Sequence, residues 1–362
     1  MVKNTNNKSV KKKVSKSKIT KEKFINKNKK ITIALIVLVG ILLIVSTYAW
    51  FSTNLNVRIK TFTMSVNKNT GLLISLDGIN FDTTIEVSYD TLFNELPRTY
   101  PNNISQWAEG GMVPVSSNGI TNHNSEFFNI FSSSGVRYKN KNKEHGFLTT
   151  NMVYENEANP FNRYLAFDVF FKNDSNSPVS DNLYFDYATE ASINEDASEE
   201  MEGLFNSLRI GIVKIGSVPK NADGYTAQSI TCNDNCNSII YEPNSTSHTE
   251  LSIERAIKYG VNLVDGHYFD TYAYRKAGGP IYVENTVSGS PYLDMNYFML
   301  QETITEADFD TPLFTVPDGI TKTRMYIWIE GQDIDSLETD SDGADISVSV
   351  SFIKDTQGYF TE

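Results

Sequence analysis

An uninterrupted uncharged segment near the N-terminus constrains this chain more than any other feature of its sequence. Residues 31–51 carry no charged side chain, and twelve lysines and one glutamate precede them. A run of this length crosses a hydrocarbon layer as a helix, and a lysine-rich flank holds that end in the cytoplasm. The sequence therefore predicts a disordered cytoplasmic arm over 1–30, a transmembrane or signal-peptide helix over 31–51, and an extracellular β-rich domain over 54–362.

The apolar segment is consistent with two outcomes: cleavage as a signal peptide or retention as a membrane anchor. Residues 31–45 have the length of a signal-peptide core, and Thr47 and Ala49 are the small residues that a signal peptidase reads. Counted through residue 51, the run instead forms a full span, with Trp50 at the outer interface. We expect either a single-pass protein of the cell membrane with its N-terminus in the cytoplasm, or a protein secreted after a cut between Ala49 and Trp50.

The rest of the chain is strongly acidic. Of the 32 basic and 44 acidic residues, twelve and one lie in the arm, so that 20 basic and 43 acidic residues remain, a formal charge near −23. Such a surface repels nucleic acid, and the arm lacks the interleaved aromatic residues of a nucleic-acid module, so we expect no such partner. The charge suits solubility, a cationic partner or calcium. About 310 residues suffice for one large domain or two modest ones, with a subdivision near residue 190.

Alternating apolar and polar residues with turn residues between them run through the acidic part. This pattern predicts an antiparallel β-sandwich with small helical insertions at 195–207 and 251–259. Turn signals indicate a hairpin at 57–76 and a strand–loop–strand unit at 164–187, whereas the polar stretches 118–144 and 219–247 are expected to be loops. The expected strands are 57–66, 72–76, 84–88, 112–115, 164–171, 183–187, 208–215, 281–284, 324–330 and 346–353.

Both cysteines fall in one short element, Cys232-Asn-Asp-Asn-Cys236. In an exported chain, two cysteines this close are expected to form a local disulfide. The closed ring is small and removes little entropy from the unfolded chain, so its role would be to fix a loop. A zinc site is less consistent with the sequence, because the four histidines do not stand at ligand spacing.

Five aspartates gather in the segment that joins the two strongest strands near the C-terminus. Carboxylates at alternate positions, with a glycine among them, can wrap a hard cation in oxygen ligands. Strands flank the segment, and Ser349 stands where an EF-hand loop closes with glutamate. The segment is therefore either a loose calcium site or a solvated hairpin loop. The candidate ligands are Asp333, Asp335, Asp340, Asp342 and Asp345.

No catalytic constellation is recognisable, so we predict no catalytic residues and no enzyme. A nucleophile elbow needs Gly-x-Ser-x-Gly, and the nearest string, at 287–291, lacks the second glycine. No His-Glu-x-x-His occurs. Carboxylate pairs for glycoside cleavage meet only in three dimensions, so the sequence carries no evidence for them.

Aromatic residues allow two interpretations. Trp328 lies inside an apolar strand and is expected in the core. Other aromatic residues either pack in the core or form a sugar-stacking surface: Trp107, Tyr268, Tyr272, Tyr274 and Tyr282.

The junction Ser46-Thr-Tyr-Ala-Trp-Phe-Ser52, followed by a strand that ends Thr61-Phe-Thr-Met-Ser-Val66, resembles the export junction of the camelysin and TasA-type matrix-fibre proteins of Gram-positive bacteria. In those proteins a dedicated signal peptidase cuts a similar junction. The string Tyr326-Ile-Trp-Ile-Glu-Gly-Gln-Asp-Ile-Asp335 also looks like a recurrent close of surface proteins from low-GC Gram-positive bacteria. The resemblance implies a jelly-roll-like sandwich that is exported and assembles by strand exchange.

Three functions remain open at this point. The first is a non-enzymatic cell-surface or extracellular-matrix protein of the kind found in biofilms, anchored or released, whose copies form fibres by strand exchange. The second is a calcium-assisted adhesin that binds a ligand or carbohydrate. An envelope hydrolase is a remote third. The expected partners are the membrane through 31–51, further copies or a surface polymer, and a signal peptidase if the segment is cleaved.

Overall fold

The computed structural model describes much of the chain beyond the apolar segment. The described residues are 57–67, 70–108, 111–121, 128–140, 143–153, 163–175, 180–193, 199–232, 236–245, 247–250, 253, 263–264, 267–268, 283–285, 292–293, 303–330, 333, 335 and 345–355. The predicted arm, the segment at 31–51 and the junction at Ala49 and Trp50 lie outside them. Among the described residues, no helix is long and apolar enough to cross a membrane.

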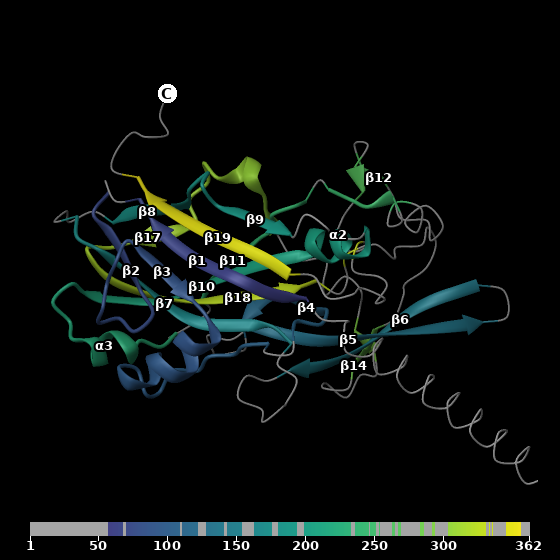
Figure 1. Ribbon diagram of the computed structural model, residues 1–362, viewed down its shortest axis with the longest axis horizontal. Coiled ribbons are helices and arrows are strands. Elements are labelled where there is room, and N and C mark those ends of the chain that lie inside the picture. The colour runs from purple at the N-terminus through teal and green to yellow at the C-terminus, as the bar shows by residue number, and fades with distance from the viewer. Residues whose placement is uncertain are drawn as a thin grey trace, which may run out of the picture. The chain divides into compact units, whose positions relative to one another are not determined.

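Strands dominate the described residues, as predicted, and most belong to two six-stranded sheets (Figure 1). Sheet 1 has the order β17-β8-β19-β1-β3, with β9 also paired to β19. Its strands are β1 (Arg58–Val66), β3 (Thr84–Val87), β8 (Asp181–Phe185), β9 (Glu190–Ile193), β17 (Phe314–Val316) and β19 (Asp345–Lys354).

Sheet 2 has the order β16-β11-β10-β18-β7-β2. Its strands are β2 (Leu72–Ser75), β7 (Leu165–Asn173), β10 (Leu208–Pro219), β11 (Asn237–Tyr241), β16 (Thr303–Ile304) and β18 (Gly319–Ile329). A five-stranded sheet and a separate pair are also described: β4 (Val115–Thr121), β5 (Phe128–Asn140), β6 (Lys143–Val153), β14 (Val283–Asn285) and β15 (Tyr292–Leu293), then β12 (Leu263–Val264) and β13 (His267–Tyr268).

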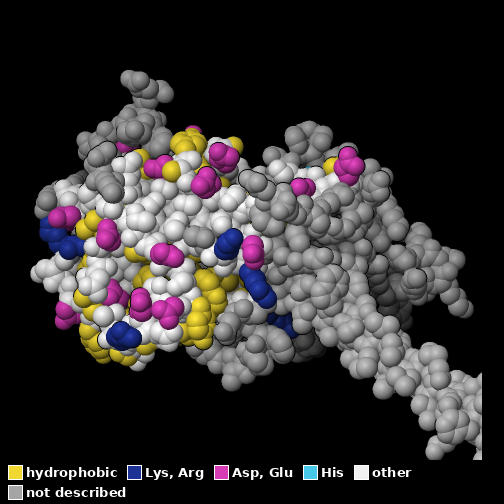
Figure 2. Space-filling model, viewed as in Figure 1, with side chains coloured by type: hydrophobic (Ala, Val, Ile, Leu, Met, Phe, Trp, Pro, Cys, Tyr) yellow, Lys and Arg dark blue, Asp and Glu magenta, His cyan; other side chains and the backbone are white. Residues whose placement is uncertain are grey.

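The described surface mixes acidic and aromatic side chains. Acidic side chains are scattered over the face shown in Figure 2, and hydrophobic ones gather between them. The described large hydrophobic residues that are most exposed are Ile79, Tyr89, Phe93, Tyr187 and Tyr225. Two of them, Tyr89 and Phe93, stack on each other at 4.8 Å between ring centroids.

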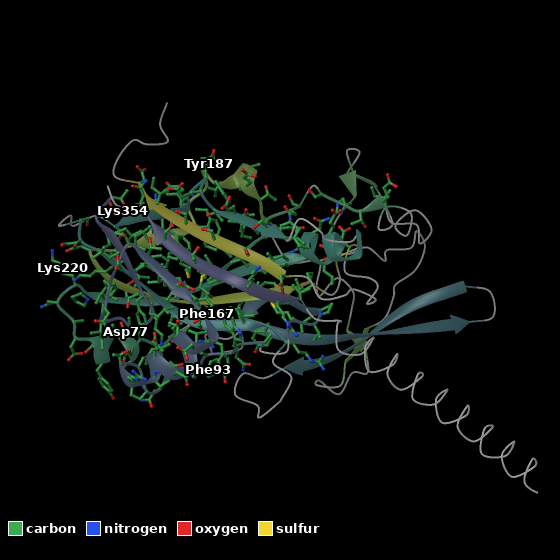
Figure 3. The ribbon with its side chains drawn as sticks, in the orientation of Figure 1. Asp77, Phe93, Phe167, Tyr187, Lys220 and Lys354 are labelled. Atoms are coloured by element: carbon green, nitrogen blue, oxygen red, sulfur yellow. A yellow bond between two sulfur atoms is a disulfide. The ribbon has the colours of Figure 1, made fainter. Side chains whose placement is uncertain are left out.

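The main core lies between sheets 1 and 2. Phe62 of β1 meets the edge of Phe167 of β7 at 5.6 Å between ring centroids, and Phe171 of β7 meets Phe352 of β19 at 4.9 Å. All four rings are fully buried (Phe167 is labelled in Figure 3). Because these contacts join one sheet to the other, the two sheets pack face to face, and alternate residues of each strand supply the core.

The prediction of a hairpin at 57–76 is wrong. β1 lies in sheet 1 and β2 in sheet 2, and the turn between them, with Gly71 at φ +70°, carries the chain across the core. β7 and β8 are divided between the sheets in the same way, as are β18 and β19 on either side of the acidic segment. Consecutive strands placed in opposite sheets can bury their apolar faces against one another in one shared core.

The first and last strands of the described fold run parallel. β1 pairs with β19 from Arg58 opposite Asp345 to Val66 opposite Phe352, with an irregularity between Ile59 and Thr61. On its other side β1 pairs antiparallel with β3. This parallel pair is an exception in two sheets that are otherwise rich in antiparallel pairs, as expected, and it places β1 inside sheet 1.

Regular structure also occurs where loops were expected. β5 and β6 form a long hairpin that includes part of the stretch 118–144, and α3 (Gly224–Gln228) and β11 lie within 219–247. Backbone pairing holds the β5–β6 hairpin, and its polar sequence gives little of the alternation on which strand prediction depends. α2 (Glu199–Asn206) falls inside the helix predicted at 195–207. Most of the helix predicted at 251–259 lies outside the described residues.

By its contacts the chain divides into two compact units, Met1–Asn54 and Leu55–Glu362. Within the second unit, strands from before and after residue 190 share both large sheets. The two sheets therefore do not divide the chain near residue 190.

Candidate functional site

Buried charged side chains gather where β10 begins and β18 ends. This Arg209 cluster consists of Arg209, Glu242, His248, Glu330, Asp333 and Asp335. The Nη2 atom of Arg209 lies 2.6 Å from Oδ2 of Asp333 and 2.8 Å from Oε1 of Glu242. The exposed fractions of these three side chains are only 0%, 1% and 3%. The guanidinium group therefore joins β10 to the segments that follow β11 and β18.

Asp335 extends the cluster. Its Oδ2 atom lies 2.6 Å from Nδ1 of His248, and its Oδ1 atom accepts the backbone N–H of Thr249 at 3.1 Å. The backbone N–H of Asp335 itself donates to Oδ1 of Asp333 at 2.9 Å. These bonds fix the segment after β18 against residues 248–249.

Glu330 completes the cluster at the end of β18, where it contacts Trp328. The indole N–H of Trp328 donates to Oε2 of Glu330 at 3.0 Å, and the backbone N–H of Glu330 donates to the carbonyl of Ser207 at 2.8 Å. Trp328 is fully buried, as predicted. In the C-terminal string 326–335, the indole of Trp328 and the carboxylates of Glu330, Asp333 and Asp335 all make contacts inside the protein. Buried contacts therefore explain why these residue types occur in the string.

Carboxylates outnumber cations in the Arg209 cluster. Burial strongly raises the pKa of Asp333, and the nearby Arg209 only partly offsets this effect. Burial alone would lower the pKa of Arg209, but the neighbouring Glu242 and Asp333 raise it above its ordinary value. Arg209 therefore keeps its positive charge, and Asp333 is a carboxyl of the cluster whose pKa is raised by burial.

We expect Asp333→Asn to flatten the pH dependence of stability. A carboxyl whose pKa is higher in the folded state than in the unfolded state binds more protons when folded, so its contribution to stability falls as pH rises from about 4 through the folded pKa. Asparagine cannot titrate, so the free energy of unfolding should change less with pH. Urea unfolding at several pH values measures the slope, with the exposed Asp345→Asn as control. An unchanged slope in Asp333→Asn would contradict a raised pKa of Asp333.

The predicted calcium ligands fall into three groups. Asp333 and Asp335 are buried and bind Arg209, His248 and backbone N–H groups, so they do not belong to a solvated loop. Asp345 is exposed at the start of β19. Asp340 and Asp342 lie outside the described residues. Among the residues that are described, no group of three or more His, Cys, Asp or Glu is arranged to hold a metal ion.

Other predicted residues take structural positions. Cys232 and Cys236 form a disulfide, with 6.0 Å between their Cα atoms. Trp107 is partly buried against the main core. Tyr268 belongs to β13, and the remaining tyrosines of the suggested sugar-stacking surface, Tyr272, Tyr274 and Tyr282, lie outside the described residues.

A second buried charged group lies on the face of sheet 2 that points away from sheet 1. In this Arg324 cluster, Nη1 of Arg324 lies 2.8 Å from Oδ1 of Asp168, and Nζ of Lys322 lies 3.4 Å from Oδ2 of the same carboxylate. The hydroxyl of Tyr100 donates to this Oδ2 at 2.7 Å. The pairing of β7 with β18 brings Asp168 opposite Arg324.

A cavity of about 300 Å³ opens over the Arg324 cluster. It lies between the segment 100–104, α3 with the residues after it, and the two strands that carry the cluster. Sequence reasoning missed this site. The available signal was charge at alternate positions of otherwise apolar strands, with Lys322 and Arg324 two residues apart in β18 and Asp168 in β7.

Comparison of the chain with family models, with curated proteins and with solved structures gives no match.

Proposed function

We propose that this chain is an exported, non-enzymatic surface or matrix protein with a jelly-roll-like sandwich, whose copies assemble by exchanging β1. The observation that carries the proposal is the position of β1. It is the first strand after the predicted export junction, and it fills the space between β19 and β3 inside sheet 1. The cleaved and the anchored form of the chain both retain it.

The contacts of β1 suit a strand that one copy supplies to another. Its neighbour β19 lies at the far end of the described chain, and Ser65 and Ser351, which contact each other, are 286 residues apart. Phe62, Met64 and Val66 are buried in the core. If β1 left its place, a slot lined by backbone hydrogen-bonding groups and apolar side chains would remain, and β1 of a second copy would fit it with the same contacts.

The two faces of β1 differ in a way that preserves the register of such an exchange. Its inward residues are large and apolar, whereas its other face pairs small hydroxyl residues with those of β19: Thr63 with Ser349 and Ser65 with Ser351. A slip by one residue would turn the hydroxyl face into the core and the apolar face out of it. The face pattern thus disfavours a one-residue slip of an inserted strand.

The double variant Ser65→Cys/Ser351→Cys tests the exchange. The hydroxyl oxygens of the two serines lie 3.1 Å apart on paired strands, a position that suits a disulfide, and both natural cysteines are already paired with each other. In assembled material, exchange would place the two new cysteines on different copies. Oxidation should then give a ladder of covalent multimers on a non-reducing gel.

The control variants are Ser65→Cys and Ser351→Cys alone, which should stop at dimers. Oxidising the double variant as a monomer should lock β1 in its own sheet and block assembly, and a reductant should restore assembly. Assembled material whose new disulfides all lie within single copies would refute strand exchange. A chain that stays monomeric at every concentration in light scattering would refute self-assembly itself.

A further inference from the structure

We propose that Lys354 and Asn173 join in an isopeptide bond, and that Asp181 catalyses its formation. The bond links the side-chain nitrogen of Lys354, on β19 of sheet 1, to the side-chain carbonyl carbon of Asn173, on β7 of sheet 2. This inference does not rest on strand exchange, because β1 takes no part in the bond.

The three side chains meet where strands of both sheets begin or end. Nζ of Lys354, which is labelled in Figure 3, donates to Oδ1 of Asn173 at 2.6 Å and to Oδ2 of Asp181 at 3.0 Å. Nδ2 of Asn173 donates to the same Oδ2 atom at 2.8 Å and to the carbonyl of Val316 at 3.0 Å. The amine, the amide and the carboxylate are therefore each within hydrogen-bonding distance of the other two.

The alternation of the strands places the amine and the amide inside the sandwich. Asn173 follows Phe171 by two residues on β7, and Lys354 follows Phe352 by two residues on β19, so each polar residue shares a face with a phenylalanine. The two phenylalanine rings contact each other in the main core. The exposed fraction of Asn173 is 0% and that of Lys354 is 2%. A lysine is rarely buried this fully, and here its partners are the two groups that amide formation requires.

Asp181 is positioned to transfer protons during the reaction. Its Oδ2 atom contacts both the nitrogen that attacks, Nζ of Lys354, and the nitrogen that leaves, Nδ2 of Asn173. Attack needs a lone pair on Nζ, so the carboxylate takes a proton from the lysine ammonium group and passes it on to Nδ2. The Nζ–Cγ bond forms and the Cγ–Nδ2 bond breaks. Nζ loses two hydrogens, Nδ2 gains both and leaves as ammonium, and Asp181 ends the reaction ionised, as it began.

The fold supplies the conditions for this reaction. Lys354 and Asn173 are 181 residues apart in the sequence, and folding converts their encounter into a step within one molecule. The pairing of Asn173 opposite Gly319 on one side and Leu72 on the other fixes the amide in sheet 2. Burial keeps out the water that would compete for the amine. The bond therefore forms after folding, and it ties one sheet to the other.

Peptide mass spectrometry of the full chain, purified in detergent, tests the bond. Trypsin should cut an unlinked chain into separate peptides that include 173–209 and 325–354. We expect one branched species instead, which joins 173–209 to 325–362 and is lighter than the two together by one ammonia. The second peptide extends to residue 362 because trypsin does not cut after an acylated lysine. Recovery of the two peptides unlinked, at their calculated masses, would overturn the proposal.

Three variants assign the roles of the residues, with circular dichroism to confirm that each one folds. Asp181→Asn removes the proton carrier and Lys354→Arg removes the attacking amine, so both should yield unlinked peptides. Lys322→Arg is the matched control, because Lys322 is also buried and lies 3.4 Å from an aspartate, Asp168, and the branched species should persist in it. A branched species at the wild-type level in Asp181→Asn would overturn the role of Asp181. Loss of ammonia from 173–209 in Lys354→Arg would show that Asn173 reacts with its own backbone, and it would overturn the bond.

Discussion

Arg209→Met should destabilise the folded protein by about 3–5 kcal/mol, because it leaves buried carboxylates without their cation. Arg209 is fully buried, and one of its nitrogen atoms contacts both Asp333 and Glu242. The expected decrease in the unfolding midpoint is roughly 10 °C. Thermal and urea unfolding, followed by tryptophan fluorescence, measure the change. The loss should be smaller at low pH, where protonation removes the uncompensated negative charges.

A surface ion pair provides the control for Arg209→Met. Lys220, labelled in Figure 3, lies 3.0 Å from Asp174 and 3.6 Å from Asp318, and its side chain is 36% exposed. Solvent screens such pairs, so Lys220→Met should leave the unfolding midpoint unchanged. If Arg209→Met lowers the stability as little as Lys220→Met does, or by an amount that does not depend on pH, then Arg209 does not stabilise the fold by balancing the buried carboxylates.

Phe62→Ala should cost about 3–5 kcal/mol, which is the usual loss when a large aromatic side chain is removed from a packed core. Phe62 is fully buried on β1, and its ring meets Phe167 across the two sheets. The variant weakens the attachment of β1 to its own core, so urea unfolding should begin at a lower concentration. If β1 is the exchanged strand, assembled material formed from this variant should also dissociate faster.

Thr63→Ala is the matched control on the same strand. Thr63 follows Phe62 directly, lies on the opposite face of β1 and pairs with Ser349. Its truncation removes little buried surface, and we expect a change within about 0.5 kcal/mol. An equal decrease in the free energy of unfolding for the two variants would show that the inward face of β1 does not stabilise the fold more than its outer face.

Alternation and turn residues predicted many strands of this fold, but they did not predict how the strands are connected. The period-two pattern of 346–353 matches β19, and that of 57–66 matches β1. The turn at 67–71 shows where the chain reverses, yet the next strand lies in the other sheet. Local sequence marks a reversal, whereas the choice of sheet depends on apolar faces that meet only when distant strands pack together.

In the candidate sites too, local sequence does not reveal which distant residues meet. The aspartates at 333 and 335 were recognisable as a cluster, but their partner Arg209 lies 124 residues from Asp333. Asp168 and Arg324 are 156 residues apart and meet through the pairing of β7 with β18. Charged residues inside apolar strands indicate that a buried partner exists. Its identity follows only from the register of the strands.

The parallel pairing of β1 with β19 determines how this fold responds to a pulling force. Because the two strands point the same way, a pull between the start of β1 and the end of β19 drives them in opposite directions along their axes. The backbone hydrogen bonds between them then carry the load together, whereas a hairpin pulled at its open end loses its bonds one at a time. A tether attached before Arg58 and a load attached after Lys354 therefore act on this pair in shear, the direction in which paired strands are mechanically strongest.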